Sequence, residues 1–314
     1  MSDTLTRGAR RPGAPGTARP VWEEPPTAVG QAGKGTVLLV VLAVVIVPIY
    51  SIALTSVSTR GAINSAGGLV LVPHGITLDA YREILTGGIV TRALLVSFGI
   101  TAVGTLVSMV VSVLCAYGLS RSRSLGHRFI LLLLIVTMFV SGGLIPSFLV
   151  VSELGGYGKY WALILPSAVS VFNILVLRSF YSTTAADLID AARIDGAGEW
   201  RILWSVVLPT SRAVTAVITL FYAVGYWNSF FNVMLYMPTD SQKWPIQYVL
   251  YQYVNLGATM PGTANSGFGA AHQAVAPLSL SMAVVVLTLA PIMIVYPFMQ
   301  KYFATGMLTG AIKG

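Results

Sequence analysis

The sequence predicts an all-α membrane protein with six transmembrane helices and both termini in the cytoplasm. Three observations predict it. Of the 314 residues, 55% are hydrophobic and only 10% are charged, and the mean hydropathy is +0.77. So few charges cannot cover the surface of a water-soluble domain of this size. Six apolar runs are long enough to cross a bilayer, which takes about 20 helical residues. Lysine and arginine are also distributed unevenly between the runs.

The six apolar runs lie near residues 36–56, 93–119, 129–150, 161–180, 213–237 and 281–299. Most of the 19 lysines and arginines fall in the N-terminal tail, in loop 120–128, between 178 and 212, and at the C-terminus. These segments would share one side of a six-helix bundle. Cytoplasmic loops carry such an excess, so this side is predicted to be the cytoplasmic one.

Helix-bending residues occur in several of the runs: Pro48, Gly142-Gly143 to Pro146, Pro166, Pro291 and Pro297. In a membrane they are tolerated where neighbouring helices or a cavity satisfy the freed backbone groups. We therefore expect some discontinuous helices, although plain kinks that help packing are the alternative.

The chain is predicted to have two parts. Residues 1–34 are rich in Pro, Gly, Ala and Arg and are expected to form a disordered cytoplasmic tail. Residues 35–314 form the transmembrane domain, whose first run is interpreted as a retained anchor rather than a signal peptide. The outer segment 57–91 is predicted to be loop over STRGAINSAGG, followed by a short helix capped by Thr77. The outer segment 238–280 contains an amphipathic stretch around WPIQYVLYQYVN and then a loop rich in Gly, Ala and Ser.

Several kinds of site are excluded by their residue patterns. The stretch GQAGKGT at 30–36 resembles a phosphate loop, but Ala28 and Gly35 stand where the pattern needs Gly and Ser or Thr. The chain is therefore predicted to have no ATP site of its own. No acidic residue lies in any of the six runs, which argues against a proton-coupled secondary transporter and against a membrane enzyme. The absence of an internal repeat also argues against a stand-alone secondary transporter.

Metal and nucleic-acid sites are not expected either. His74, His127 and His272 are isolated from other ligand-type residues, and the only cysteine, Cys115, lies within a run. A disulfide framework and a cysteine metal site are thus unavailable. The net charge of +8 comes from basic residues scattered at the ends of the runs rather than clustered with aromatic residues, so no nucleic-acid partner is predicted.

The segment 182–209 is unusually polar for this chain. Four of the 11 acidic residues lie in it: Asp187, Asp190, Asp195 and Glu199. Thr184 and Asp187 have the spacing of a capping box that starts a helix. Gly196 is predicted to break that helix, and a second amphipathic helix should follow, with Trp200, Leu203, Trp204 and Val207 on one face and Pro209 at its end. Two short helices joined at a glycine would make a knob facing the cytoplasm; a solvated connecting loop is the alternative.

The same segment carries a resemblance to a known family. The string Asp190-Ala191-Ala192, then Asp195-Gly196-Ala197, then Val206-Val207-Leu208-Pro209 resembles the EAA loop of ABC importer permeases. The stretches PHGITLDAYREIL, GYWNSFFNVMLYM and YPFMQKYFATGMLTGAIKG are similar to the outer short helix, the fifth span and the C-terminal tail of the carbohydrate-uptake permeases. The resemblance covers nearly all of 36–314 and implies a type I ABC importer permease fold. Asp190 stands where the motif has Glu.

The resemblance implies that the knob is a coupling helix that docks on a separate ATPase subunit. The residues it assigns to coupling are Asp190, Ala191, Ala192, Arg193, Asp195, Gly196, Ala197, Glu199 and Pro209. It also implies that this chain binds no cofactor and is not an enzyme, because ATP and Mg would be bound by the partner ATPase. The expected partners are an unlike second permease, two ATPase subunits, an extracellular solute-binding protein and membrane lipid, in the plasma membrane of a prokaryote.

A candidate substrate path lies on the fifth run, where residues at intervals of three and four share one helical face. They are Tyr222, Gly225, Asn228, Ser229, Asn232 and Tyr236. Aromatic rings, amides and hydroxyls suit a sugar, although the same residue types also bind helix to helix in membranes. The predicted function is the permease subunit of an ATP-driven importer for a sugar or oligosaccharide. Import of a peptide or a polyol, and a stand-alone secondary transporter, are the alternatives.

Overall fold

The computed structural model describes residues 28–86, 88–121, 126–140, 142–183, 186–255 and 276–311, and these are almost entirely helices and connecting turns. The chain divides into two compact units, 1–49 and 50–314, and the bundle described below belongs to the second unit. Helix α1 (Ala28–Ser56) begins in the first unit. Residues 28–34, predicted to be part of a disordered tail, are therefore helical, and residues 1–27 lie outside the described residues.

Among the residues that the structure describes, three helices are long and apolar enough to cross a membrane: α1, α4 (Ile89–Leu119) and the first part of α15 (Pro277–Ala311). Three bent pairs raise the count to six if each pair is one span. In the first, α5 (His127–Phe139) and α6 (Leu144–Glu153) meet at 116°. In the second, Trp161–Ser167, made of α7 (Trp161–Ile164) and η1 (Leu165–Ser167), meets α8 (Val171–Thr183) at 50°. In the third, Glu199–Thr210 meets α12 (Arg212–Trp227) at 86°. The six predicted spans agree with this upper count.

The breaks follow some of the predicted bending residues and not others. Gly143 has a φ of 80° immediately before α6, and Pro166 lies in η1 just before α8, so both predicted interruptions are confirmed. The other three prolines named above, Pro48 in α1 and Pro291 and Pro297 in α15, remain inside continuous helices, so the discontinuity occurs at only some of the predicted positions.

The prediction of one continuous fifth run over 213–237 is wrong. Helix α12 ends at Trp227, and a separate short helix, α13 (Phe231–Tyr236), follows the turn at Asn228. Apolar residues resume after Asn228 and Ser229, and the polar residues keep the spacing of a continuous helix, so the sequence pattern did not reveal the turn. The turn places Asn228 and Ser229 at a break in the bundle.

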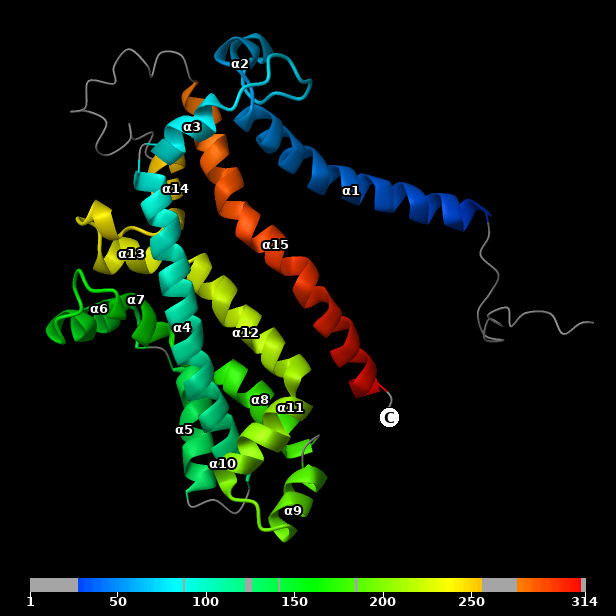
Figure 1. Ribbon diagram of the computed structural model, residues 1–314, viewed down its shortest axis with the longest axis vertical. Coiled ribbons are helices and arrows are strands. Elements are labelled where there is room, and N and C mark those ends of the chain that lie inside the picture. Colours follow the sequence, from blue (N-terminus) through cyan, green and yellow to red (C-terminus); the bar gives the residue numbers. More distant parts are fainter. Residues whose placement is uncertain are drawn as a thin grey trace, which may run out of the picture. The chain divides into compact units, whose positions relative to one another are not determined.

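Helix α4 runs through the bundle and packs along α12 and α8 (Figure 1). Gly104 permits the close approach to α12, since a Cβ there would lie 2.8 Å from three ring atoms of Tyr226. The hydroxyl of Tyr226 lies 2.9 Å from Oγ of Ser108, and the hydroxyl of Tyr222 lies 2.7 Å from Oγ of Ser112. Small residues and buried hydroxyl pairs therefore join the two helices, as is common for helices in membranes.

The two predicted outer segments meet at one end of α4. Helix α3 (Asp79–Thr86) and α14 (Ile246–Asn255) lie near that end, whereas α9 (Ala186–Ile194) lies near the other (Figure 1). Oγ1 of Thr77 accepts from the amide of Asp79 at 3.2 Å, so the short helix predicted there forms. The loop predicted over STRGAINSAGG is wrong: it contains α2 (Arg60–Ala66), capped by Thr59. The Gly-, Ala- and Ser-rich stretch after α14 lies outside the described residues.

An ion pair lies beyond α13 at the same end of the bundle. Nζ of Lys243 lies 2.8 Å from Oδ2 of Asp240 and also donates to the carbonyl of Gly158 at 3.2 Å. The hydrogen bond from Lys243 lowers the pKa of the Asp240 carboxyl below its ordinary value. The pair ties the segment after α13 to the loop before α7.

Candidate functional site

The knob predicted between residues 182 and 209 forms two short helices joined by a glycine turn. Helix α9 ends at Ile194, and α10 (Glu199–Ile202) starts after Gly198. Gly196 adopts a φ of 78°, in the left-handed region that a side chain makes costly. The amide of Ala197 donates to the carbonyl of Ala192 at 3.0 Å, which closes the end of α9. The predicted break at Gly196 is therefore confirmed, while Thr184 of the predicted capping box lies outside the described residues.

The second helix of the knob does not end at Pro209 as predicted. It passes through a wide π-helical turn, η2 (Leu203–Val207), and continues as α11 (Leu208–Thr210) before the bend at Ser211. Proline lacks an amide, and its ring clashes with the carbonyl four residues earlier. For Pro209 that carbonyl belongs to Ser205, which lies inside the wide turn, so the turn accommodates the proline without ending the helix.

The predicted apolar face of this helix is only half buried. Leu203 and Val207 are buried in the core, whereas Trp200 and Trp204 are about two thirds exposed, at 66% and 65%. The two tryptophans line an apolar groove of about 690 Å³ together with residues of α4 and α12.

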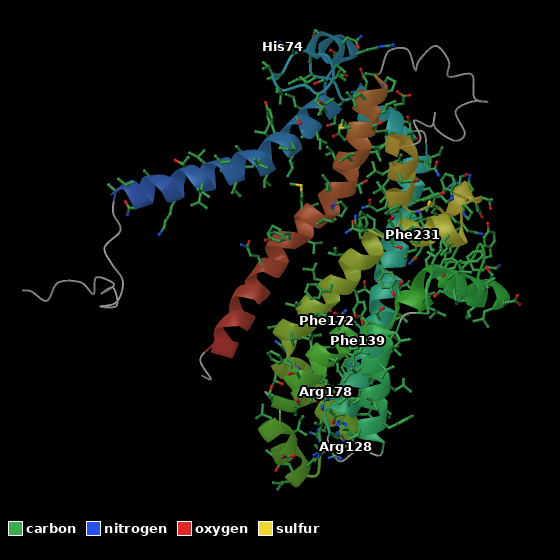
Figure 2. All side chains as sticks on the ribbon, turned by 180° about the vertical axis from the view of Figure 1, so that it is seen from behind. His74, Arg128, Phe139, Phe172, Arg178 and Phe231 are labelled. Carbon is green, nitrogen blue, oxygen red and sulfur yellow. The ribbon has the colours of Figure 1, made fainter. Side chains whose placement is uncertain are left out.

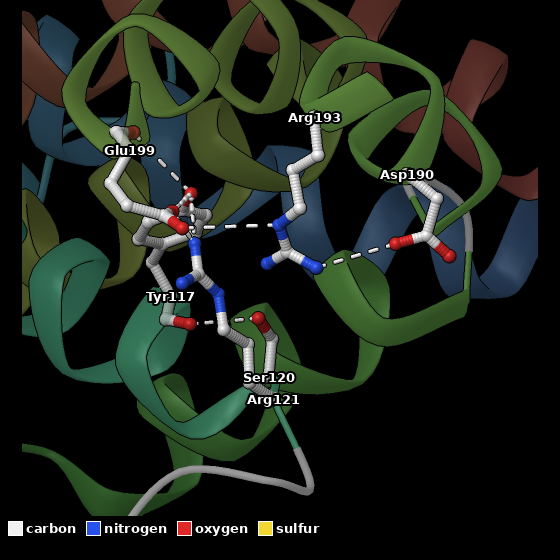
Figure 3. A network of polar contacts seen from close by, with 6 residues as sticks. All are labelled: Tyr117, Ser120, Arg121, Asp190, Arg193 and Glu199. Carbon is white, nitrogen blue, oxygen red and sulfur yellow. Dashed lines mark hydrogen bonds and ion pairs between the residues drawn. The ribbon is translucent and has the colours of Figure 1, made fainter. Parts of the chain in front are cut away.

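Charged residues of the knob join a polar network at the end of α4 (Figure 3). Arg193 pairs with Asp190 at 3.3 Å and with Oε1 of Glu199 at 3.8 Å. The hydroxyl of Tyr117 donates to Oε2 of Glu199 at 2.6 Å, and the same oxygen forms an ion pair with Arg121. The Arg121 guanidinium lies over the Tyr117 ring, 4.6 Å from its centroid. Three segments of the chain, α4, α9 and α10, therefore meet in one network.

Only part of this network could be predicted from the sequence. The structure brings together Asp190, Arg193 and Glu199 from the predicted set, and leaves Asp195 exposed in the turn. Tyr117 and Arg121 were missed as partners of the knob. Their only signal was a charged residue directly after an apolar run, which is ordinary at the end of a membrane helix.

A polar cavity of about 400 Å³ lies between the breaks in two spans. The residues that line it are Ser167, Ser170, Asn173, Phe221, Tyr222, Gly225, Tyr226, Asn228, Ser229, Phe230, Phe231 and Asn232. Among these described residues none is charged. Hydroxyls, amides and aromatic rings therefore make up its polar and apolar surface, a composition typical of sites for small polar ligands.

The cavity is built where the helices are interrupted. One wall comes from the turn between η1 and α8, where the amide of Ser170 donates to the hydroxyl of Tyr222 at 3.2 Å. The other comes from the turn after α12, and Nδ2 of Asn232 donates to Oγ of Ser167 at 3.4 Å. Irregular backbone in a membrane protein is tolerated where it lines a cavity, which explains the position of both breaks.

Five of the six residues predicted for the substrate path line this cavity, namely Tyr222, Gly225, Asn228, Ser229 and Asn232. Tyr236 does not: it is 3% exposed and its ring stacks on Phe148 with centroids 6.0 Å apart. The break at Asn228 turns the chain, so α13 no longer continues the helical face on which Tyr236 was placed. The sequence did not indicate Ser167, Ser170 and Asn173, although Pro166 marked the break beside them.

Discontinuous helices around a cavity inside an apolar bundle are typical of membrane transport proteins. The family model described as binding-protein-dependent transport system inner membrane component matches residues 104–309. The chain belongs to this family, and the membership inferred from the EAA-like loop is confirmed.

Relatives and a solved structure are similar over most of their length. The polygalacturonan/rhamnogalacturonan transport system permease protein YtcP of Bacillus subtilis (strain 168) is 41% identical over 280 residues, which cover 88% of this chain and 96% of that protein. Protein LplC of the same strain is 39% identical, over 87% of this chain and 90% of that protein. A crystal structure of a bacterial ABC transporter involved in the import of the acidic polysaccharide alginate matches with a TM-score of 0.81 and 28% identity, over 88% and 96% of the two chains. The predicted ABC importer permease fold is confirmed.

Proposed function

We propose that this chain is one of two permease subunits of an ATP-driven importer, and that it forms one wall of the path for an oligosaccharide. The observation that carries the proposal is the uncharged cavity between broken helices in a chain of this family. An extracellular binding protein delivers the solute, and two ATPase subunits on the cytoplasmic side drive transport. The chain itself binds neither ATP nor Mg, and it lies in the plasma membrane of a prokaryote with both termini in the cytoplasm.

Oligosaccharide is the solute class that the cavity supports best. Sugars present hydroxyls to amide and hydroxyl groups and C–H faces to aromatic rings, and Asn228, Asn232, Tyr222 and Phe230 supply both kinds of contact. Names of relatives point the same way, since they include transport of polygalacturonan and rhamnogalacturonan and of diacetylchitobiose. Acidic sugars are the first to test, because the relative named for polygalacturonan and rhamnogalacturonan transport is 41% identical. Since no charged residue lines this wall, a uronate carboxylate would contact the second permease instead.

Coupling is assigned to the knob formed by α9 and α10. It is rich in charge, it lies at the end of α4 away from α3 and α14, and the glycine turn presents it as a compact projection (Figure 1). Docking on an ATPase subunit would let closure of the ATPases move the spans between inward and outward access. Asp190 is 73% exposed and Asp195 is exposed, so both are available to such a partner.

Purification and uptake test the proposal together. The tagged full-length chain is purified in mild detergent from its native host, and the proteins retained with it are identified by mass spectrometry. We expect a second permease and an ATPase. Uptake of labelled trigalacturonate and of neutral arabinotriose is then compared between the parent strain and a strain lacking this chain. Trigalacturonate uptake should be lost.

The outcomes separate the parts of the proposal. Loss of arabinotriose uptake with normal trigalacturonate uptake would overturn the acidic-sugar choice and leave the permease assignment standing. A chain that retains no ATPase and still transports would be a stand-alone transporter. If the strain lacking this chain loses only the uptake of a labelled peptide or polyol, that compound replaces oligosaccharide as the proposed solute class.

A further inference from the structure

We propose that Tyr117 and Arg121, at the end of α4, are positioning residues that fasten the knob to α4, so that α4 carries the movement of the knob to the cavity. The inference rests on the proposed function, because it assumes that an ATPase moves the knob. It adds two residues outside the EAA-like loop and a route between the two polar regions of the chain.

At the knob, the Glu199 carboxylate makes the contacts that join α10 to the end of α4. Oε2 of Glu199 accepts from the Tyr117 hydroxyl at 2.6 Å and pairs with the Arg121 guanidinium, which in turn donates to the Tyr117 hydroxyl. Such charge-assisted hydrogen bonds are stronger than neutral ones, and the guanidinium also lies over the Tyr117 ring. The side chain of Arg121 is only 29% exposed. Both of the closest contacts of Oε2 of Glu199 are thus made with residues at the end of α4, although the Glu199 side chain is 52% exposed.

The end of α4 is also held from a second side. Nε of Arg178 in α8 donates to the carbonyl of Leu119, the last residue of α4, at 2.8 Å. Figure 2 shows Arg178 toward the end of the bundle where α9 lies. The terminal carbonyl of α4 is thus bonded to α8, and the residues at this end are bonded to the knob, so movement of the knob would be passed to this end of α4.

Further along, the same helix contacts the wall of the cavity. Ser112 and Ser108 of α4 are hydrogen-bonded to the hydroxyls of Tyr222 and Tyr226, and both tyrosines line the cavity. The Tyr226 hydroxyl also donates to the carbonyl of Ile164, near the break before α8. A shift or rotation of α4 therefore alters the hydrogen bonds of two residues in the cavity wall.

Loss of the ion pair between Arg121 and Glu199 should change ATP hydrolysis and solute uptake in opposite directions, whereas destabilisation of the complex would lower both. If the knob is no longer fastened to α4, the ATPases can close and reopen without moving the spans. ATP hydrolysis in the absence of solute should then rise, while solute uptake falls. A misfolded or poorly assembled complex would lose both activities.

The experiment uses the complex that co-purifies with the full-length chain, reconstituted in lipid. Arg121→Gln removes the charge, Tyr117→Phe removes the hydroxyl, and Arg121→Lys retains the charge. The matched control is Arg128→Gln, which removes an exposed arginine from α5 at the same end of the bundle (Figure 2). Three quantities are measured: the amount of ATPase retained, hydrolysis of ATP without solute, and uptake of trigalacturonate.

We expect Arg121→Gln to retain the ATPase and to raise solute-free hydrolysis by about threefold or more, which matches the coupling found within ion-pair networks. Tyr117→Phe should give a smaller rise, Arg121→Lys should restore most of the restraint, and Arg128→Gln should behave as the parent. Unchanged hydrolysis in Arg121→Gln, with the ATPase retained, would overturn the inference and leave the proposed function intact. A fifth variant, Glu199→Gln, is measured in the same way, and loss of coupling in it but not in Arg121→Gln would overturn the inference by showing that Glu199 serves the ATPase directly. Failure to retain any ATPase in the parent would instead contradict the proposed function.

Discussion

The knob and the cavity are both polar, yet they are built from different chemistry. Arg121, Arg193, Asp190 and Glu199 form ion pairs at the knob, with exposed fractions from 29% for Arg121 to 73% for Asp190. The cavity, between the broken spans, contains hydroxyls, amides and aromatic rings, and none of its described lining residues is charged. Helix α4 contacts both regions, because its end joins the network and its Ser108 and Ser112 are hydrogen-bonded to tyrosines of the cavity wall.

The difference follows from the cost of charge in an apolar surrounding. A charged side chain within a bilayer is expensive, whereas neutral hydroxyls and amides can pair with one another at lower cost. At the end of the bundle the charges remain partly hydrated, so holding them there costs less free energy than within the bilayer. The chain therefore has a charged, partly exposed region at one end and an uncharged lining between its broken spans.

The largest effect should come from the glycine turn of the knob. Gly196→Val places a branched residue at a φ of 78°, and left-handed backbone costs about 1–2 kcal/mol for a residue with a Cβ. We expect the turn to rearrange and trigalacturonate uptake to fall about tenfold or more. Membrane insertion should be normal, since no apolar run changes.

The matched variant for this turn is Gly196→Asn, because asparagine tolerates left-handed backbone better than other residues. No side chain or backbone atom lies within 4 Å of a Cβ built at Gly196, so space is not the constraint within the chain. Asparagine should therefore retain most uptake. Normal uptake by Gly196→Val at normal expression would mean that the knob does not couple transport to ATP.

A smaller effect is expected where α4 meets the cavity wall. In Gly104→Ala the new Cβ would lie 2.8 Å from the Tyr226 ring, whose hydroxyl is bonded to Ser108 and to the carbonyl of Ile164. Because the ring is held at its far end, α4 and α12 must separate. Overpacking of this kind costs about 1–3 kcal/mol, measurable as a lower unfolding midpoint in detergent.

Gly99→Ala is the control for this change, since it lies in the same helix and nothing lies within 4 Å of its Cβ position. There alanine should leave the midpoint unchanged or raise it, because glycine is a poor helix former. Equal midpoints for the two variants would argue that Tyr226 does not pack against α4 as described.

The smallest effect should come from a single residue of the cavity wall. Asn232→Leu removes an exposed amide that donates to Ser167 at 3.4 Å, so folding and assembly should be little affected. If the amide contacts the solute, uptake should fall about two- to tenfold, as expected for one hydrogen bond of roughly 0.5–1.5 kcal/mol.

Gln242→Leu is the comparison for Asn232→Leu, because it removes an exposed amide outside the cavity. Its uptake should equal that of the parent. If both variants transport normally, the face formed by Asn228, Ser229 and Asn232 has no part in the path.

What depends on local sequence could be predicted from it. Composition and the apolar runs indicated a helical membrane protein, because a bilayer requires long apolar helices whatever their packing. The knob followed from the spacing of its charges and from Gly196, since a turn between two short helices is decided by a few adjacent residues. Two residues of the cavity wall, Tyr222 and Gly225, followed from the periodicity of α12, and Asn228 and Ser229 lie in the turn after it. Asn232 lies in α13, and it lines the cavity although the continuous helix assumed for it does not form.

What depends on contacts between distant segments was decided by the tertiary structure. Tyr117 and Glu199 are 82 residues apart in the chain, and Ser108 and Tyr226 are 118 apart, so no local pattern could pair them. The break at Asn228, which removed Tyr236 from the cavity, occurs in a mostly apolar run whose polar residues keep the spacing of one continuous helix. Whether such a run stays helical depends on which neighbours satisfy its freed backbone groups, and in an apolar solvent only packing against other helices can supply them.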